Sequence, residues 1–367
     1  MKLTKKSATG LLIRYLYEGL CRGRVCMNRA RSQDRDLSVY YGGARSGNLG
    51  GTLVKVARLQ KVFPERKWGF NMVYNLSNAS YLNKQAIRSL KRQKVPIVHN
   101  QNGTFYPAWY GGDWIRENKR MAEVFHAADH VFYQSEFCRD AAIYHLGERK
   151  GSGEILYNAV DTNVFTPEEK KKNVRAYSFL VTGKISLHLW YRLESTLLAL
   201  GWASRMGENY TLLIAGWMSP VVKRLVRDLV SELKLEDQVR ILGTYTQSEA
   251  PAIYRKADAY IMMKHQDPCP NAVIEALSAG LPVLYSRSGG VSELVGNDAG
   301  VGIECELSWD RICVPSPEEI GRGMIQLAST SEGMPEAARH RACSRFDISH
   351  WVERHREIFS RMLSAVA

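Results

Sequence analysis

The sequence predicts an α/β fold built on parallel sheets, and three observations support this prediction. From residue 37 onward, segments typical of strands alternate with loops and with segments of helical period. The strand segments in the second half are mostly continuous runs of leucine and β-branched residues, as in parallel sheets covered on both faces. With 367 residues and 45% apolar content, the chain is long enough for two or three domains with buried cores.

In the first half, short strands are each followed by a helix or a polar loop. The expected elements are strands at 37–41, 71–76, 96–99 and 131–134 and helices at 52–63 and 84–93. Ser135 follows the last of these strands and has a side chain suited to capping a further helix. The run EEKKKN at 168–173 is charged and lacks an apolar period, so it predicts a linker between domains.

The second half repeats the alternation and ends in helices. The expected elements are strands at 179–182, 211–215, 239–242 and 259–263, helices at 220–233 and 249–256, and a helical tail over 317–367. The predicted organisation is a basic segment at 1–36, a first domain at 37–167, a second domain at 168–345 and a C-terminal helix at 346–367.

The composition limits the cellular setting and the class of partner. A formal net charge of +13 and a pI near 9.4 favour polyanionic partners such as nucleic acid, an anionic membrane or phosphate-bearing substrates. The apolar run from Leu11 to Leu20 is short and holds Arg14 and Glu18, so it predicts neither a membrane span nor a signal peptide. Seven cysteines without a Cys-x-x-Cys pair indicate reduced thiols in the cytosol.

The N-terminal segment carries nine Lys or Arg residues against three acids. It predicts an amphipathic helix, whose apolar residues are Leu11, Leu12, Tyr15, Leu16 and Leu20. Such a helix can lie on an anionic lipid leaflet, or it can pack its apolar stripe on the adjoining domain. Packing on the domain is the favoured interpretation, and membrane contact stays open.

The stretch from Lys264 to Glu293 contains a predicted short helix with one acid before it and one within it. Pro270 suits the first turn of a helix, and Gly280 can take the left-handed conformation that ends it. Asp267 precedes this helix and Glu275 lies within it, so both carboxylates can reach the same end of a sheet. A carboxylate can accept hydrogen bonds from two neighbouring ribose hydroxyls.

A glycine-rich loop follows the two acids. Ser288, Gly289 and Gly290 are expected to present backbone N–H groups at a helix start, where phosphate oxygens bind well. A ribose, a phosphate and a further polyhydroxylated group together describe a nucleotide sugar. The alternative is an ordinary helix with solvated acids, which is the commoner fate of a single glutamate.

This stretch resembles the signature of the retaining glycosyltransferases of family 4, which share the two-domain GT-B fold. That pattern is an acid, seven residues, a glutamate, then alanine, a small residue, glycine and Pro-Val. The matching residues here are Asp267, Glu275, Ala276, Gly280, Pro282 and Val283. The first acid is usually glutamate in the family. Prolines at 268 and 270 replace small residues, which leaves the amides of Cys269, Asn271 and Ala272 to hold the donor sugar.

The resemblance also implies roles for residues outside this stretch. Lys184 and Arg192 match the cations that clamp the donor diphosphate, with the two residue types exchanged. Gly50 and Gly51 match a loop that faces the donor diphosphate and the acceptor, and Tyr245 lies where relatives hold the base. Without the resemblance, Lys184 and Arg192 are equally consistent with surface cations.

The expected acceptor side follows the strand at 96–99. Asn102 takes the place of a histidine that approaches the donor sugar in many relatives. The aromatic loop beyond it can stack on sugar rings. Its expected acceptor-binding residues are Tyr106, Trp109, Tyr110 and Asp113. The same cluster is also consistent with a small core under a long loop.

The resemblance therefore implies two Rossmann-like domains facing each other across a cleft, with the last helix crossing back to the first domain. The expected activity is a metal-independent, retaining hexosyl transfer from a UDP- or GDP-sugar to a glycan, lipid-linked or phosphate-bearing acceptor. It would serve cell-surface polysaccharide or glycolipid synthesis in the cytoplasm, at the inner face of the membrane. The expected catalytic residues are Asp267, Lys184, Arg192 and Asn102.

No cofactor beyond the nucleotide sugar, no metal site and no nucleic acid partner are expected. Two rival interpretations stay open. One is a sugar-nucleotide epimerase of the same fold. The other is a non-catalytic binding protein: the basic charge and the aromatic residues suggest nucleic acid as its ligand, although no recognised nucleic-acid-binding motif is present, and the departures at Asp267 and Asn102 leave a glycan binder without turnover open.

Overall fold

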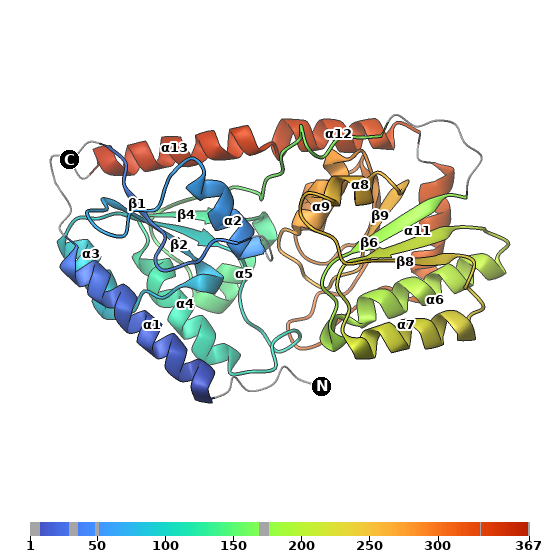
Figure 1. Ribbon diagram of the computed structural model, residues 1–367, viewed down its shortest axis with the longest axis horizontal. Helices are drawn as coiled ribbons and strands as arrows, with labels where there is room; N and C mark the ends of the chain where they lie inside the picture. The colour runs from blue at the N-terminus through green and yellow to red at the C-terminus, as the bar shows by residue number, and fades with distance from the viewer. Residues whose placement is uncertain (1–7, 29–35, 48–50, 169–175, 331, 366–367) are drawn as a thin grey trace. The chain divides into compact units, whose positions relative to one another are not determined.

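The computed structural model describes residues 8–28, 36–47, 51–168, 176–330 and 332–365 (Figure 1). It divides into two compact units. The first contains the described residues up to Tyr157 together with those from Ser349 onward, and the second contains Asn158–Ile348. The first unit therefore ends before the boundary expected at 167, and the C-terminal helix belongs to it.

The first unit contains a parallel sheet of five strands in the order β1-β2-β3-β4-β5. In chain order the strands are β1 (Val39–Tyr40), β2 (Met72–Leu76), β3 (Ile97–Gln101), β4 (His130–Tyr133) and β5 (Ser152–Ile155). The helices between them are α2 (Gly51–Gln60), α3 (Lys84–Arg92), α4 (Trp114–Ala127) and α5 (Glu136–Leu146). The strands and helices expected in this region are confirmed, with ends that differ by a few residues.

Side-chain caps fix the starts of three of these helices. Asn83, Asp113 and Ser135 each accept a hydrogen bond from a backbone N–H in the first turn of α3, α4 and α5, respectively. The capping role expected for Ser135 is confirmed, because its hydroxyl accepts from the amide of Cys138 at 3.0 Å.

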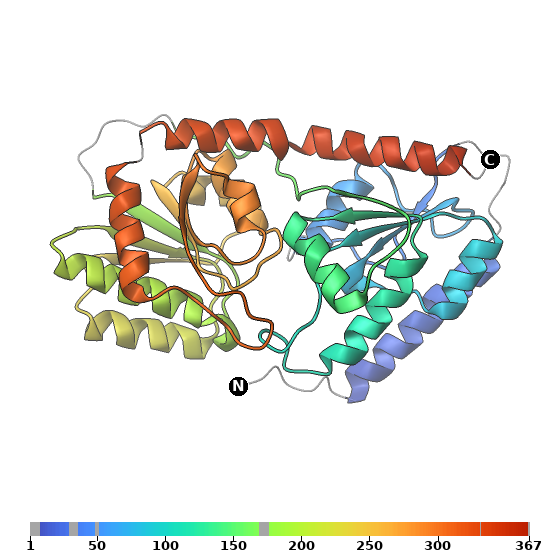
Figure 2. The ribbon, with the colours of Figure 1, turned by 180° about the vertical axis from the view of Figure 1, so that it is seen from behind.

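The two faces of the first sheet are covered by different parts of the chain. One face packs on α3, α4 and α5 in a buried cluster that includes Val73 and Val131. Helix α13 (Ile348–Ser364) lies on the other face, where Phe359 meets Tyr74 with ring centroids 5.9 Å apart. Figure 2 shows this red helix running along the sheet of the first unit.

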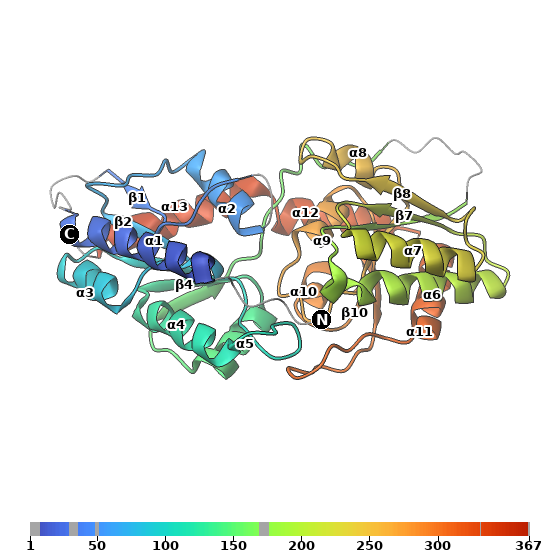
Figure 3. The same cartoon turned by 60° about the horizontal axis from the view of Figure 1, so that its bottom comes forward.

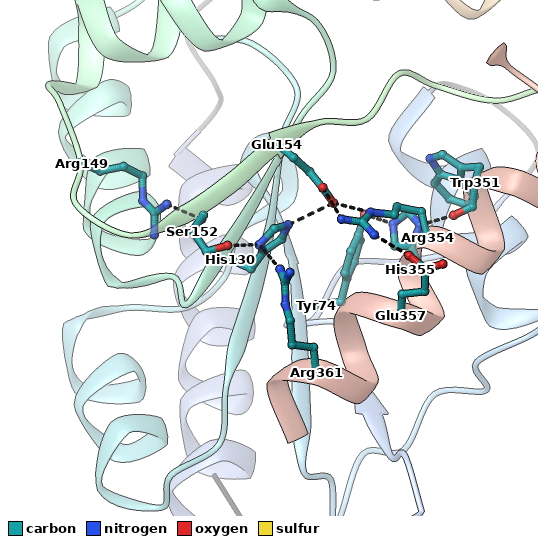
Figure 4. A network of polar contacts seen from close by, with 10 residues as sticks. All are labelled: Tyr74, His130, Arg149, Ser152, Glu154, Trp351, Arg354, His355, Glu357 and Arg361. Carbon is teal, nitrogen blue, oxygen red and sulfur yellow. Dashed lines mark hydrogen bonds and ion pairs between the residues drawn. The ribbon is translucent and has the colours of Figure 1, made fainter. Parts of the chain in front are cut away.

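A polar network also joins α13 to this sheet (Figure 4). Glu154 on β5 accepts from Arg354 and lies 3.5 Å from Nε2 of His130 on β4. His355 is fully buried, and its ring nitrogens contact Tyr74 Oη at 3.0 Å and the carbonyl of Trp351 at 2.7 Å. The return of the C-terminal helix to the first domain is confirmed.

The second unit contains a parallel sheet of six strands in the order β11-β10-β9-β6-β7-β8. The strands are β6 (Ser178–Thr182), β7 (Thr211–Ala215), β8 (Val239–Gly243), β9 (Ala259–Met262), β10 (Val283–Ser286) and β11 (Gly300–Ile303). The helices are α6 (Tyr191–Arg205), α7 (Pro220–Glu232), α8 (Ala250–Tyr254), α9 (Asn271–Ser278), α10 (Val291–Val295), α11 (Pro317–Ser329) and α12 (Met334–Arg345). The order reverses between β6 and β9, and open α/β sheets bind ligands at such a point.

Helix α1 (Ala8–Met27) packs on α3, and Cys21 and Val25 are fully buried. The expected apolar stripe lies on the opposite side, where Leu12, Leu16 and Leu20 are 59%, 60% and 57% exposed. The favoured interpretation, in which this stripe packs on the domain, is therefore wrong. The helix has a second apolar face, and that face is the one that packs. Among the described residues, no helix is long and apolar enough to cross a membrane.

Candidate functional site

The loops at the carboxyl ends of β6 and β7 approach each other closely beside the point where the strand order reverses. Gly216 has φ 118°, and a Cβ placed on it would lie 2.1 Å from the carbonyl oxygen of Gly183. The amide of Gly183 donates to the carbonyl of Ala215 at 3.1 Å, and that of Ile185 donates to Trp217 at 2.7 Å. Glycine at these positions therefore fixes the backbone that carries Lys184.

Lys184 and Arg192 both lie at this end of β6. The guanidinium of Arg192 reaches back from the start of α6 and donates to the carbonyl of Thr182 at 3.3 Å. Arg192 is 6% exposed, and its Nε has no hydrogen-bond partner among the described residues. The Lys184 ammonium lies 5.1 Å from the ring centroid of Trp217. The structure thus brings the two predicted cations to one strand end.

Asp267 joins the same edge from the loop after β9. Its Oδ2 accepts from the Lys264 ammonium at 2.6 Å, and the Asp267 side chain is only 12% exposed. The backbone of Asp267 forms a parallel bridge with Gly289. A Cβ on Gly289, which has φ 83°, would lie 2.6 Å from the carbonyl oxygen of Asp267. The close approach ties the acid loop to the glycine-rich loop.

The expectation that Ser288, Gly289 and Gly290 all present bare amides is wrong. The amide of Ser288 donates to the carbonyl of Ser286 at 2.7 Å, and that of Gly290 donates to Asp267 at 2.9 Å. The amide of Cys269 likewise donates to Oδ1 of Asp267 at 3.2 Å. The bond from Gly290 joins the two loops, and the other two bonds each hold one loop in its own conformation.

The remaining donor-side amides lie at the start of α9. Asn271 is its first residue and Ala272 its second, and the first N–H groups of a helix have no partner within the helix. Pro270 is the N-cap and offers no side-chain hydrogen bond. Gly280 has φ 72° after the end of this helix, so its predicted left-handed conformation is confirmed.

Glu275 lies on α9 in a group of tyrosines. Its Oε2 accepts from the hydroxyl of Tyr254 at 2.9 Å, and Tyr254 is fully buried. Thr182, the last residue of β6, lies 3.0 Å from the hydroxyl of Tyr260. Burial raises the pKa of Tyr245, and the neighbouring Tyr260 and Glu275 raise it further. Glu275 and Tyr245 are therefore brought together, and Tyr254 holds the carboxylate.

In the first unit, Asn102 belongs to a polar cluster at the end of β3. Its Oδ1 accepts from the Lys55 ammonium at 3.2 Å and also from Gln134. Its Nδ2 donates to Asn78 at 2.8 Å. Lys55 comes from α2, is 6% exposed and also donates to Asn100 at 2.7 Å. Both the oxygen and the nitrogen of the Asn102 amide therefore have hydrogen-bond partners.

The glycine-rich loop before α2 is described only in part. Gly51 is the first residue of α2, and Gly50 lies outside the described residues. His99 lies on β3, three residues before Asn102, and is fully buried between Asn75 and Gln101. Burial lowers the pKa of His99 to about 4, so this imidazole is neutral at pH 7.

The aromatic loop has a buried and an exposed part. Tyr106 is 5% exposed and stacks on His145 with centroids 5.7 Å apart. Trp109 stacks on Phe105 and keeps 39% of its surface exposed. The amide of Tyr110 donates to the carbonyl of Tyr106. The loop ends at Asp113, the N-cap of α4. It leaves Trp109 as an aromatic surface within reach of a ligand.

The site geometry in the second unit can be compared with known proteins. Residues 168–341 match the family model described as glycosyl transferases group 1. This part of the chain, just under half of it, is therefore similar to the glycosyl transferases group 1. Curated relatives agree with this assignment at low identity.

Two of these relatives cover much of the chain. One is a subunit of the human phosphatidylinositol N-acetylglucosaminyltransferase, which is 23% identical over 68% of this chain and 49% of its own length. The Mycobacterium tuberculosis glycogen synthase is 21% identical over 79% of this chain and 68% of its own length. The chain thus spans about half the length of the human relative.

Solved structures share the fold of this protein over most of the chain. A Rickettsia africae glycosyltransferase superposes with a TM-score of 0.65 at 16% identity, over 94% of this chain and 95% of that one. Anabaena HepE in complex with UDP gives a TM-score of 0.63 at 15% identity, over 80% and 79%. The two parallel sheets with alternating helices and these neighbours establish the GT-B fold.

Sequence reasoning missed four residues that hold the site. In the group 1 domain they are Lys264 beside Asp267, Trp217 beside Lys184 and Tyr254 beside Glu275; in the first unit, the residue is Lys55. Lys264 directly follows an expected strand, which could have marked it as a residue of the same edge. The other three come from distant elements, so no local pattern pointed to them. The described residues contain no group of three or more His, Cys, Asp or Glu that could hold a metal ion.

Proposed function

We propose that this protein is a retaining glycosyltransferase that moves a hexosyl group from a UDP- or GDP-linked donor to a glycan, lipid-linked or phosphate-bearing acceptor. The observation that carries this proposal is the meeting of Lys184 and Arg192 with Asp267 and Glu275 along one edge of the sheet in a group 1 domain. The UDP complex of the HepE neighbour supports a uridine nucleotide as the first donor to test.

The site residues expected in the second unit each have a task in donor binding. Glu275 accepts from the ribose hydroxyls, and the Tyr254 hydroxyl keeps its carboxylate oriented. Lys184 and Arg192 bind the diphosphate, while Tyr245 lies beside the base. The first amides of α9, at Asn271 and Ala272, face the donor sugar.

The reaction needs little from the protein beyond position and charge. The bond between the anomeric carbon and the diphosphate breaks while the acceptor oxygen attacks from the same face. The departing phosphate takes the proton of the acceptor hydroxyl, so no side chain has to act as a base. Negative charge grows on the leaving diphosphate, and the fixed cations Lys184 and Arg192 stabilise it most in the transition state. These cations would do the work of a metal ion.

Asp267 and its partner Lys264 form a pair suited to hydrogen bonds with the hydroxyls of the transferred sugar. The carboxylate can accept from a hydroxyl, and the ammonium retains further protons to donate. In the first unit, Gln134 and Lys55 fix the direction of the Asn102 amide, which can itself bond a sugar hydroxyl.

The acceptor proposal rests on the first unit. Trp109 offers a partly exposed aromatic face, which suits stacking on a sugar ring. Lys55 brings a positive charge to the end of β3, which suits a phosphate-bearing acceptor. The name of the human relative, which contains phosphatidylinositol, supports a lipid-linked acceptor. Such an activity would serve cell-surface polysaccharide or glycolipid synthesis from the cytoplasm.

Thermal melting with excess UDP, GDP or ADP tests the donor site. A ligand at a hundred times its dissociation constant adds about 2.7 kcal/mol of stability, which raises the melting temperature by a few degrees. We expect one nucleotide to stabilise the wild type and to leave Glu275→Ala unaffected. The matched control is Glu304→Ala, because the Glu304 side chain is 87% exposed in the same unit.

Two further measurements separate the parts of the proposal. Release of the stabilising nucleotide from its sugar conjugate, in the presence of a chelator, tests turnover without metal. The anomeric configuration of the product, read by NMR, tests retention. If no nucleotide shifts the melting temperature, the donor site is refuted. Stabilisation without turnover over a panel of acceptors would favour a non-catalytic binding protein.

A further inference from the structure

Helix α1 presents an unusual apolar surface. Leu12, Leu16 and Leu20 follow one another at a spacing of four residues, so they form a single stripe along the helix. Each is more than half exposed, and Ile13 at 59% and Met27 at 65% extend the stripe. Leucines scattered singly on a surface need no explanation, but a continuous stripe on one helix indicates an interaction site.

The stripe is held in a fixed position by the rest of the first unit. Cys21 and Val25, on the opposite side of α1, are fully buried. Arg22 donates to Gln85 of α3 at 2.9 Å, and Gln93 at the end of α3 donates to the carbonyl of Val25 at 2.8 Å. Helix α1 therefore does not need to rearrange in order to expose its stripe.

The neighbouring helix α3 has a strongly basic outer face. Its sequence is KQAIRSLKR, and its exposed basic residues are Lys84, Arg88, Lys91 and Arg92. Lys91 pairs with Asp129 at 2.6 Å and Lys84 with Glu123 at 3.6 Å. Within the described part of the chain, no ion pair neutralises Arg88 or Arg92. Figure 3 shows α1 along the outside of this unit with α3 beside it.

An apolar stripe beside a basic face matches the chemistry of an anionic lipid surface. Apolar side chains of a surface helix enter the boundary between headgroups and acyl chains, and each nearby Lys or Arg adds electrostatic attraction. We propose that α1 and α3 form a membrane-binding surface that docks the first unit on an anionic bilayer through Leu12, Leu16, Leu20, Arg88 and Arg92. The net charge of +13 supports an anionic partner.

A second copy of the chain fits this surface less well. A two-fold dimer places the same patch of both copies face to face, so the basic faces of the two α3 helices would approach each other. A stable dimer also needs about 800 Å² per partner, which is more than one stripe of leucines on a single helix supplies. Anionic lipid headgroups provide the opposite charge, and a fluid lipid surface does not require a complementary protein shape.

Sedimentation of the full-length protein with lipid vesicles tests this inference. We expect binding at low salt to phosphatidylcholine vesicles that contain phosphatidylglycerol, and little binding to phosphatidylcholine alone. The double variant Leu16→Ser and Leu20→Ser should bind at least about tenfold more weakly. Both side chains are exposed, so the variant should melt like the wild type. The matched control is Leu307→Ser with Ile312→Ser, which removes two exposed apolar side chains from the second unit.

A second pair of variants separates a local surface from net charge. Arg88→Gln with Arg92→Gln should weaken binding by about tenfold. Arg224→Gln with Arg227→Gln removes the same charge from the exposed side of α7 and should leave binding unchanged. This test uses no nucleotide or acceptor, so its outcome is independent of the proposed transferase activity.

Several results would overturn the inference. The wild type could fail to bind anionic vesicles, or the leucine double variant could bind as well as the wild type. Equal losses in both arginine pairs would mean that binding follows net charge alone. Light scattering coupled to size exclusion gives the oligomeric state. A dimer that the leucine variant converts to a monomer would identify a second copy as the occupant.

Discussion

At the scale of single residues, the candidate site depends on places where two backbones approach too closely for a side chain. Gly289 is the clearest example, because the Asp267 loop occupies the space that a Cβ would need. The same contact aligns Asp267 with the strand edge through the bridge to Gly289. Glycine here is required by a neighbour distant in sequence as well as by its own φ of 83°.

Gly289→Ala should therefore lower both stability and nucleotide binding. The matched control is Gly207→Ala, because Gly207 also has a positive φ, 92°, but has no atom within 4 Å of its Cβ position. The control should cost only the left-handed strain of alanine, about 1 kcal/mol, and keep the shift in melting temperature with nucleotide. Gly289→Ala should cost more and lose that shift. Equal effects in urea unfolding and melting would contradict the role of the close approach.

At the scale of elements, helix α13 covers one face of the first sheet, although it comes from the far end of the chain. Phe359 packs on Tyr74 of β2, which lies far earlier in the chain, and a polar network accompanies this contact (Figure 4). Burial by itself would raise the pKa of Glu154, but its hydrogen bonds with His130 and Arg354 hold that pKa at about 2. The network therefore makes the docking of α13 dependent on pH.

The sign of this dependence follows from the lowered pKa of Glu154. The contribution of Glu154 to stability is fully present above its ordinary value of 4.5 and is lost as the pH falls toward about 2. Glu154→Gln should thus be less stable than the wild type at pH 7, with a difference that shrinks between pH 4.5 and pH 2. Urea unfolding over this range measures it, and a constant difference would refute the argument. Glu304→Gln, an exposed acid in the other unit, should show no such trend.

His355 adds a second, separate pH dependence to the same contact. Burial lowers its pKa from 6.5 to about 3, so the native state keeps the ring neutral while the unfolded chain takes up a proton. Stability from this residue is present above pH 6.5 and declines as the pH falls to about 3. This decline should appear in the wild type and also in Glu154→Gln, where loss of the Glu154 charge lowers the pKa of His355 further.

At the scale of the whole molecule, the chain forms two units with separate cores, and its end returns to the first. The expected nucleotide-binding residues Glu275, Lys184 and Arg192 lie between Asn158 and Ile348, whereas α13 belongs to the other unit. Stability of the first unit and nucleotide binding by the second should therefore respond to different substitutions.

Phe359→Ala tests this separation. Removing a fully buried phenylalanine costs about 3–5 kcal/mol, so the melting transition of the first unit should fall sharply. The nucleotide should still stabilise the second unit, as followed by calorimetry with and without ligand. The control Ser360→Ala, on the exposed side of α13, should melt like the wild type. Loss of the nucleotide effect in Phe359→Ala would show that the units are coupled.

The sequence predicted the elements well because their signals are local. Continuous apolar runs marked the strands, Ser135 marked a helix start and Gly280 a helix end. The spacing from Asp267 to Glu275 carried the family resemblance. Prediction from sequence failed where the bonding of a group depended on a partner elsewhere in the chain. The amides of Ser288 and Gly290 looked available, but the carbonyls of Ser286 and Asp267 accept from them.

By itself, then, the sequence determined the α/β class, the order of the strands along the chain and the two acids with their glycine-rich loop. Only the tertiary structure decided that Lys264 neutralises Asp267, that Tyr254 holds Glu275 and that α1 buries Cys21 instead of its leucine stripe. The physical reason is that helical and strand periods fix which residues share a face. Which face is buried depends on what packs against it, and that partner comes from another part of the chain.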